Sequence, residues 1–130
     1  MTGQVLQATA DVLVVEDDPD LNELVGAYAQ LSGFGYRAAA TGASALSEAK
    51  AHPPALVLLD LMLPDMEGFD VCRRLKSEPA TAHVPVVFLT CMDKEECRAR
   101  GMACGAAAFL TKPFDPERLM NALRLHACPR

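Results

Sequence analysis

The sequence predicts a single α/β domain in which a five-stranded parallel sheet has helices on both faces. Along the 130 residues, short aliphatic runs alternate five times with longer segments in which apolar residues recur at helical spacing. The clearest aliphatic run, Ala55–Leu59, follows Pro53-Pro54 and ends at Asp60. It has no polar side, which is typical of strands in parallel sheets, because helices cover both of their faces. We therefore expect right-handed crossovers that place helices on both sides of the sheet.

The strands are expected where short apolar runs are bounded by turn residues. They are predicted at residues 11–15, 35–40, 55–59, 84–89 and 106–110. The second run is the weakest, because Tyr36 is its only aromatic residue. Each run is followed by a segment long enough for a helix, as a parallel connection requires.

The helices are expected between and after these strands. They are predicted at residues 19–31, 42–51, 65–77 and 93–103, and from residue 116 onward. Asp18 before Pro19 and Asp115 before Pro116 each predict an N-cap followed by proline at the first helical position. Thr41 is the expected N-cap of the second helix. The fourth segment is rich in charged residues and poor in apolar ones, so we expect it to be among the least stable elements.

Composition and charge exclude several classes of protein. Hydrophobic residues make up 51% of the chain and charged residues 22%, which is ordinary for a globular domain with one core. The formal net charge of -5 and the scattered basic residues argue against a nucleic-acid-binding surface. No apolar run is long enough to cross a membrane and no signal peptide pattern is present, so we expect a cytoplasmic protein without a membrane partner. Residues 1–10 are expected to form a flexible leader and residues 11–128 the domain.

The cysteines and histidines give no sign of a metal or catalytic centre of their own. The cysteines are Cys72, Cys91, Cys97, Cys104 and Cys128. Their number is odd and they include no C-x-x-C pair, so we expect reduced, mostly packed thiols rather than disulfides or zinc ligands. The histidines are isolated from one another, and none is expected to be a catalytic base.

Polar side chains stand at the carboxyl ends of four predicted strands. Glu16 and Asp17 follow the first strand, Asp60 the third, Thr90 the fourth and Lys112 the fifth. In a sheet of order 2-1-3-4-5 these groups converge on one edge, where α/β folds bind ligands. Carboxylates gathered in one crevice repel one another unless a cation lies among them, and oxygen ligands of this kind suit Mg²⁺. The set is suited to a phosphoryl group on or near Asp60, because phosphoryl transfer needs positioning and charge neutralisation.

Four motifs, in this order and at these separations, resemble those of a known family. They are Val14–Pro19, Leu59–Gly68, Pro85–Thr90 and Phe109–Phe114. With them the chain closely resembles the receiver domains of two-component response regulators, from Asp11 to about Leu125. The resemblance implies a flavodoxin-like (βα)5 fold with strand order 2-1-3-4-5. It also implies a signalling domain that catalyses its own phosphorylation and dephosphorylation, not an enzyme that acts on other substrates.

The resemblance assigns roles to the residues at the centre of the site. Asp60 would accept a phosphoryl group from the phosphohistidine of a partner, either a histidine kinase or a histidine phosphotransfer protein. Asp17, Asp60 and the backbone carbonyl of Met62 would bind Mg²⁺, and Glu16 would act through water. Lys112 would pair with the phosphoryl oxygens.

The resemblance also implies a switch. Thr90 would shift toward the phosphoryl group, and Phe109 would move between exposed and buried rotamers. The Lys112-Pro113 peptide bond would be cis, which aims the lysine into the site. The surface formed by the fourth helix, the fifth strand and the fifth helix would change, and it would bind an output partner or a second copy of the chain.

The chain departs from the family's usual pattern at several positions near the site. Met62 and Met92 stand where polar residues often assist hydrolysis, so we expect a phosphorylated state that is long-lived. Cys91 stands where a smaller residue is usual, which would narrow the entry for phosphate. Residues 105–108 lack the acidic residue commonly found before the aromatic position, here Phe109.

Two other functions compete with this one. A binding module that is regulated without phosphorylation is disfavoured, because the polar residues at the strand ends are all intact. A Mg²⁺-dependent phosphohydrolase with Asp60 as nucleophile is also disfavoured. Such enzymes commonly have a second Asp two positions after the nucleophile, where this chain has Met62.

Overall fold

Parallel strands form one sheet at the centre of the molecule. The computed structural model describes residues 11–90 and 95–127, so the predicted leader at 1–10 lies outside the described residues. The strands are β1 (Asp11–Val15), β2 (Gly35–Ala39), β3 (Leu56–Leu59), β4 (Val86–Thr90) and β5 (Ala108–Thr111). Their order is β2-β1-β3-β4-β5 and every pairing is parallel, which confirms the predicted sheet.

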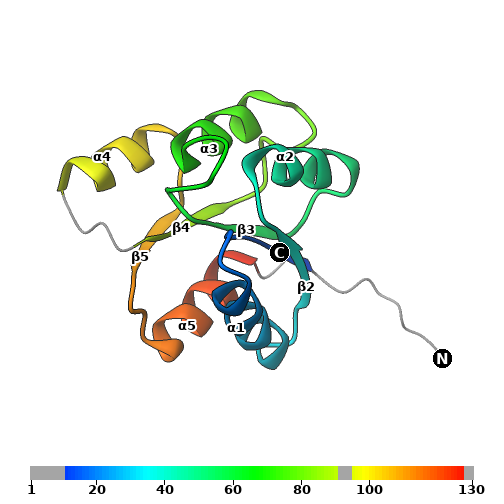
Figure 1. The fold of residues 1–130 in the computed structure, drawn as a ribbon, viewed down its shortest axis with the longest axis vertical. Coiled ribbons are helices and arrows are strands. Elements are labelled where there is room, and N and C mark those ends of the chain that lie inside the picture. Colours follow the sequence, from blue (N-terminus) through cyan, green and yellow to red (C-terminus); the bar gives the residue numbers. More distant parts are fainter. Residues whose placement is uncertain (1–10, 91–94, 128–130) are drawn as a thin grey trace.

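Helices cover both faces of this sheet, as predicted. They are α1 (Pro19–Leu31), α2 (Gly42–Ala51), α3 (Gly68–Ser77), α4 (Glu95–Ala103) and α5 (Pro116–Ala127). Figure 1 shows α2, α3 and α4 on one face and α1 and α5 on the other. No helix in the described ranges is long and apolar enough to cross a membrane.

Each face of the sheet has its own hydrophobic core, because successive strand residues point to opposite sides. In β3, Val57 belongs to the core under α2 and α3, whereas Leu58 belongs to the core under α1 and α5. Every residue of β3 is buried, which confirms the reading of this run as a strand covered on both faces. Burying a side chain of this size contributes about 1.5–3 kcal/mol, so the central strands form a rigid base for the loops that follow them.

The predicted caps define where three helices begin. The Asp18 carboxylate accepts hydrogen bonds from the N–H groups of Asp20 (3.0 Å) and Leu21 (3.4 Å) at the start of α1. Thr41 Oγ1 accepts one from Ser44 N–H (3.1 Å) at the start of α2. At α5, the Asp115 carboxylate accepts one from the N–H of Glu117 at 3.0 Å. These hydrogen bonds therefore confirm the N-caps predicted at Asp18, Thr41 and Asp115.

One predicted helix boundary was wrong. The sequence predicted the third helix from about Asp65, but α3 begins at Gly68. Residues 61–67 form a closed loop instead: Gly68 N–H donates to Leu61 C=O at 2.7 Å, and Met62 pairs with Glu67 in an isolated bridge. The backbone of this segment is engaged in its own closure, so the helix starts only after it.

Three strands begin later than the sequence predicted, and β3 does so by one residue, because it starts at Leu56 rather than Ala55. β4 starts at Val86 rather than residue 84, because Pro85 has no N–H to give to the sheet, although its carbonyl accepts from Val57 N–H at 3.0 Å. β5 starts at Ala108 rather than residue 106, because Ala106 N–H donates to Gly101 C=O at 3.1 Å and so belongs to the end of α4.

The cysteines in the described ranges are free and at least partly packed. Cys72 is buried in α3, and Cys97 and Cys104 are half-buried. Burial raises the pKa of the Cys72 thiol to about 11, which keeps this thiol protonated and unreactive at neutral pH. Cys91 and Cys128 lie outside the described residues.

Candidate functional site

The carboxyl edge of the sheet brings together the polar residues that the sequence singled out. Glu16 and Asp17 follow β1, Asp60 follows β3, Thr90 is the last residue of β4, and Lys112 follows β5. Backbone hydrogen bonds extend the ladder into this region: Asp60 N–H donates to Val15 C=O at 3.0 Å, and Lys112 N–H donates to Thr90 C=O at 2.7 Å. The hydrogen bonds of the sheet therefore fix the backbone from which these side chains extend.

Three carboxylates form a compact cluster at this edge. Oxygens of Glu16, Asp17 and Asp60 all lie within 4.8 Å of one another. Glu16 is 4% exposed and Asp60 is 8% exposed, whereas Asp17 is exposed at the mouth of the site. Such crowding of like charges away from water is costly unless positive charge is supplied.

Lys112 supplies part of that positive charge. Its ammonium donates a hydrogen bond to Glu16 Oε1 at 2.8 Å and lies 3.5 Å from Asp60 Oδ2. Burial raises the pKa of Glu16, and the charge of Asp60 adds to this effect, while hydrogen bonds from Lys112 and from a backbone N–H oppose it. Burial alone would lower the pKa of Lys112, but the hydrogen bond to Glu16 and the charge of Asp60 outweigh burial and raise it. Lys112 is therefore a permanent cation, and the cluster still has more acidic groups than basic ones.

The donor set of the cluster fits a magnesium ion. All three side chains offer carboxylate oxygens, the hard ligands that Mg²⁺ prefers. Two oxygens on opposite sides of an ion bound at about 2.1 Å stand about 4.2 Å apart. Oxygens within 4.8 Å of one another can therefore reach a shared ion after small movements.

Asn22 supports this cluster from behind, and sequence reasoning missed it. Its side-chain amide in α1 donates to the carbonyls of Val14 (3.1 Å) and Glu16 (3.0 Å), where β1 ends and the acidic residues begin. The Tyr36 hydroxyl bonds to the Asn22 side-chain oxygen in turn. The signal in the sequence was a single amide within the otherwise apolar stripe of α1 that contains Val25. A buried amide in such a stripe indicates a partner that needs its hydrogen bonds.

Thr90 and Phe109, the two residues that the resemblance assigned to a switch, lie on the neighbouring strands β4 and β5. Thr90 is buried at the end of β4, the strand that pairs with β3. Phe109 in β5 is half-buried, and its ring centre lies 5.1 Å from that of Phe88. Gly101 in α4 leaves the space that the Phe109 ring fills, since a Cβ there would overlap the ring. The position of Phe109 therefore depends on where α4 lies.

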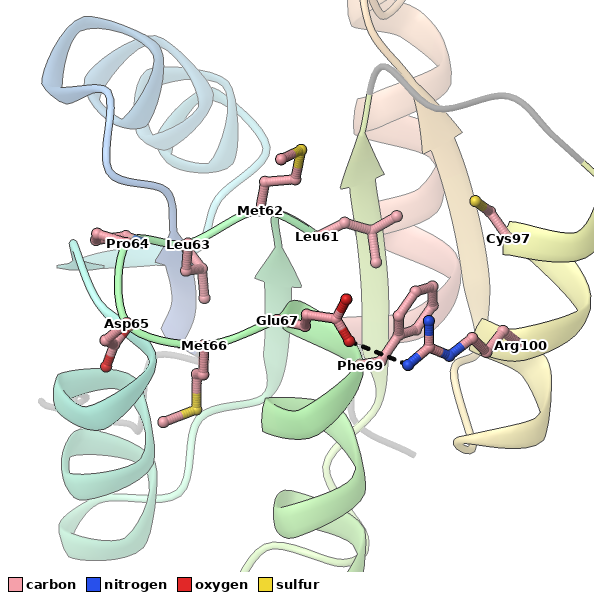
Figure 2. A pocket seen from close by; sticks show the side chains of 10 residues that line it. All are labelled: Leu61, Met62, Leu63, Pro64, Asp65, Met66, Glu67, Phe69, Cys97 and Arg100. Atoms are coloured by element: carbon pink, nitrogen blue, oxygen red, sulfur yellow. Dashed lines mark hydrogen bonds and ion pairs between the residues drawn. The ribbon is translucent and has the colours of Figure 1, made fainter.

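Met62 has its backbone close to Asp60 and an exposed side chain. Its backbone follows Asp60 closely, with Met62 N–H 3.4 Å from Asp60 Oδ1. Its side chain is 67% exposed and lines a pocket of about 460 Å³ beside the site, with Leu61, Phe69 and Cys97 among its walls (Figure 2). The long-lived phosphorylated state that was expected from Met62 stays a prediction. Met92 lies outside the described residues.

The peptide bond between Lys112 and Pro113 is cis, as the resemblance implied. This bond lies directly after β5, at the point where the chain leaves the sheet edge. The Lys112 ammonium reaches Glu16 and Asp60 from here, so the two ends of the sequence meet in one site.

Comparison with known proteins agrees with the geometry. The family model described as the response regulator receiver domain matches residues 12–124. The chain belongs to this family. The match spans the strands except for Asp11 and the helices except for the end of α5, so the fold and the carboxyl edge described above are those of a receiver domain.

Relatives of this receiver domain include longer regulators and solved structures. It is 36% identical over 113 residues to the DNA-binding dual master transcriptional regulator RpaA of Synechocystis sp., covering 87% of this chain and 47% of the relative. The chain thus spans about half the length of this relative. A putative response regulator from Chloroflexus aurantiacus has a TM-score of 0.88 at 27% identity, covering 94% of this chain and 100% of that one. The receiver domain of the sensor histidine kinase PA1611 from Pseudomonas aeruginosa, with magnesium in its active site cleft, has a TM-score of 0.85 at 24% identity, covering 94% and 100%.

Proposed function

We propose that this receiver domain takes a phosphoryl group onto Asp60 from the phosphohistidine of a histidine kinase or a histidine phosphotransfer protein, in a reaction that requires Mg²⁺. The observation that supports this most directly is the cluster of Glu16, Asp17 and Asp60 with the Lys112 ammonium among them. This combination serves phosphoryl transfer, in which the protein mainly positions the reactants and neutralises charge.

Asp60 is the nucleophile in this reaction. An oxygen of its carboxylate forms a bond to phosphorus while the bond from phosphorus to the histidine nitrogen breaks, and the electron pair of that bond stays on the leaving imidazole. Asp17, Asp60 and the Met62 carbonyl would hold Mg²⁺, and Glu16 would act through water. A bound Mg²⁺ supplies charge neutralisation to the phosphoryl oxygens.

Lys112 and Thr90 change their contacts when Asp60 is phosphorylated, and these changes alter the rest of the domain. When the Asp60 carboxylate becomes an acyl phosphate, the negative charge lies farther out, on the phosphoryl oxygens, and Lys112 pairs with these instead of Glu16. The Thr90 hydroxyl moves toward the same oxygens and donates a hydrogen bond. The space that Thr90 leaves allows Phe109 to turn inward, which changes the surface of α4, β5 and α5. This surface then binds an output partner or a second copy of the chain.

Two findings support the metal requirement. The oxygens of the carboxylate cluster lie close enough to share one ion. A protein of the same fold, the PA1611 receiver domain, coordinates magnesium in its active site cleft.

Intact mass spectrometry after incubation with acetyl phosphate and Mg²⁺ tests the proposal. We expect one added phosphoryl group on the wild type and none on Asp60→Ala. Excess chelator should prevent the mass increase in the wild type. A phosphoryl group that persists in Asp60→Ala, or that forms equally well with chelator, would contradict the proposal.

A further inference from the structure

The loop between β3 and α3 is tied to the first turn of α2 by Asp65. One carboxylate oxygen of Asp65 accepts a hydrogen bond from Gly42 N–H at 2.8 Å, and the other accepts one from Ala43 N–H at 2.9 Å. These bonds lower the pKa of Asp65 below its ordinary value. Figure 2 shows Asp65 at the turn of the loop, above the helix α2. Asp65 therefore caps a helix that is 23 residues away in the sequence.

The carboxylate completes the hydrogen bonding of the α2 N-terminus. The first N–H groups of a helix have no partner inside it and need acceptors from elsewhere. Thr41 Oγ1 accepts from Ser44 N–H at 3.1 Å, and Asp65 accepts from the two N–H groups before it. The local cap and the distant cap thus divide the first turn between them, and only the distant cap restrains the loop.

Packing brings the same loop against α2. A Cβ at Gly42 would overlap the side chain of Met66, so the absence of a side chain there allows the loop to lie on the helix. The base of the loop is closed by Gly68 N–H, which donates to Leu61 C=O at 2.7 Å. A Cβ at Gly68 would overlap the carbonyl of Asp60. The loop is thus fixed at its base and at its tip.

Met62 lies between these two fixed points. We propose that Asp65 is a positioning residue for the metal site: by anchoring the loop to α2, it holds the Met62 carbonyl beside Asp60 before Mg²⁺ arrives. This inference rests on the proposed function, in which that carbonyl is a metal ligand. Mg²⁺ demands near-ideal octahedral geometry, and ligands that are already in place bind it without the cost of ordering a loop.

Asp65→Asn tests the inference, because an amide has only one oxygen that can accept and one α2 N–H loses its partner. By titration calorimetry, we expect the Mg²⁺ dissociation constant to rise about three- to tenfold, near the lower end of the loss seen when supporting partners of metal ligands are removed. At saturating Mg²⁺, the phosphorylation rate should return to within about twofold of the wild type, since Asp65 does not touch the reacting atoms. A second variant, Gly42→Ala, pushes Met66 and the loop away from α2 while keeping the carboxylate, and should raise the dissociation constant in the same direction.

Two matched controls separate positioning from helix stability and from charge. Thr41→Val removes the local cap of α2 but leaves Asp65 in place, so it should lower thermal stability without changing the Mg²⁺ dissociation constant. Glu67→Gln removes one negative charge from the same loop without touching α2, and should leave the constant near the wild-type value.

The outcomes are distinguishable. An unchanged dissociation constant in Asp65→Asn overturns the inference. An equal rise in Thr41→Val, or in Glu67→Gln, overturns it as well, because helix stability or charge would then be the cause. A wild type that binds no Mg²⁺ overturns the metal requirement of the proposed function, and this inference with it.

Discussion

The helices α3 and α4 lie side by side on the same face of the sheet, yet they are attached to it very differently (Figure 1). α3 has a continuous buried stripe, which consists of Gly68, Phe69, Val71, Cys72 and Leu75. In α4, Gly101 is the only buried position. A helix with a wide apolar stripe is held by the core, whereas a helix without one depends on a few contacts at its surface.

The contacts that hold α4 are weak, and some of them are made with the β3–α3 loop and the start of α3. Arg100 forms an ion pair with Glu67 at 3.0 Å, and its guanidinium lies 4.3 Å from the centre of the Phe69 ring. Both partners in the ion pair are more than half exposed, so this pair contributes at most about 1 kcal/mol. Further contacts are the Phe109 ring against Gly101, the Arg98 guanidinium 5.9 Å from the centre of the same ring, and the half-buried Cys97 against the core. The difference teaches that α3 is a fixed wall of the site, whereas α4 can move at low cost when Phe109 moves.

The largest difference between the two helices should appear in stability. Leu75→Ala removes a fully buried side chain of α3 and should lower the free energy of unfolding by about 2–5 kcal/mol. Met102→Ala removes an exposed side chain of α4 and should change it by about 0.5 kcal/mol or less. Chemical denaturation of both variants beside the wild type measures these values.

A chemically matched pair sharpens this test, because both helices contain a cysteine. Cys72→Ala in α3 deletes a buried sulfur and should cost about 1–2 kcal/mol, whereas Cys97→Ala in α4 should cost less than about half of that. Equal losses at the two positions would mean that α4 is anchored as firmly as α3.

A second test uses two glycines, one in α1 and one in α4. A Cβ at Gly26 would overlap the Tyr36 ring, which its hydrogen bonds to Asn22 hold in place, so Gly26→Ala should cost about 1–3 kcal/mol. A Cβ at Gly101 would overlap the Phe109 ring, which is half-buried and can turn outward. Because alanine also favours the helix by about 1 kcal/mol, Gly101→Ala should be nearly neutral.

The Gly101→Ala variant also has a structural readout. Nuclear Overhauser contacts between the rings of Phe88 and Phe109 should weaken as the second ring turns outward. If the contacts persist and the variant is as destabilised as Gly26→Ala, the Phe109 ring is fixed, and α4 is not coupled to a mobile side chain.

The third test asks which helix responds to phosphorylation. We expect phosphorylation of Asp60 to change amide hydrogen exchange in α4 and around Phe109 by about tenfold or more, within the usual range of coupling between sites. Exchange in α1 should change much less, because α1 has a buried stripe and its own core. Equal changes in α1 and α4 would remove the distinction between a fixed and a movable side of the domain.

Much of this domain could be predicted from the sequence, for physical reasons. Apolar runs without alternation identify buried parallel strands, and the carboxyl ends of such strands meet at one edge whatever the details of packing. For this reason Asp60 and Lys112, which are distant in the sequence, could be expected in one crevice. The Lys112 Nζ atom lies 3.5 Å from Asp60 Oδ2. The weak attachment of α4 was also predictable, because a segment with few apolar residues cannot bury a stripe.

The supporting residues could not be predicted, because their partners are distant in the sequence. Asp65 shows why. An aspartate after Pro64 favours a helix start, and the sequence predicts a helix from about that residue. Asp65 does cap a helix, but the helix is α2, and no local pattern indicates which helix N-terminus lies within reach. Asn22 poses the same problem, because its carbonyl partners follow from the packing of α1 on β1.

The smallest expected effect concerns two acidic residues of the β3–α3 loop, which bind two different helices. Asp65 binds backbone N–H groups of α2, whereas Glu67 pairs with Arg100 of α4. The pKa of Asp65 is lowered in the folded protein, so its contribution to stability is present above its unfolded value, about 3.9, and is lost as the pH falls through the folded value. The carboxylate accepts both bonds only when it is ionised. Protonation should therefore release the first turn of α2.

Amide chemical shifts measure this event at single residues. In a pH titration by NMR, the amide protons of Gly42 and Ala43 should shift together, with an apparent pKa below that of an ordinary aspartate. These pH-dependent shift changes should be absent in Asp65→Asn. The amide of Gly101 in α4 serves as an internal reference, because its chemical shift should not change with the titration of Asp65. A midpoint at the ordinary value of aspartate would mean that the hydrogen bonds to α2 are not kept in solution. The contact between Asp65 and α2 would then restrain the loop no more than the exposed ion pair between Glu67 and Arg100 of α4 does.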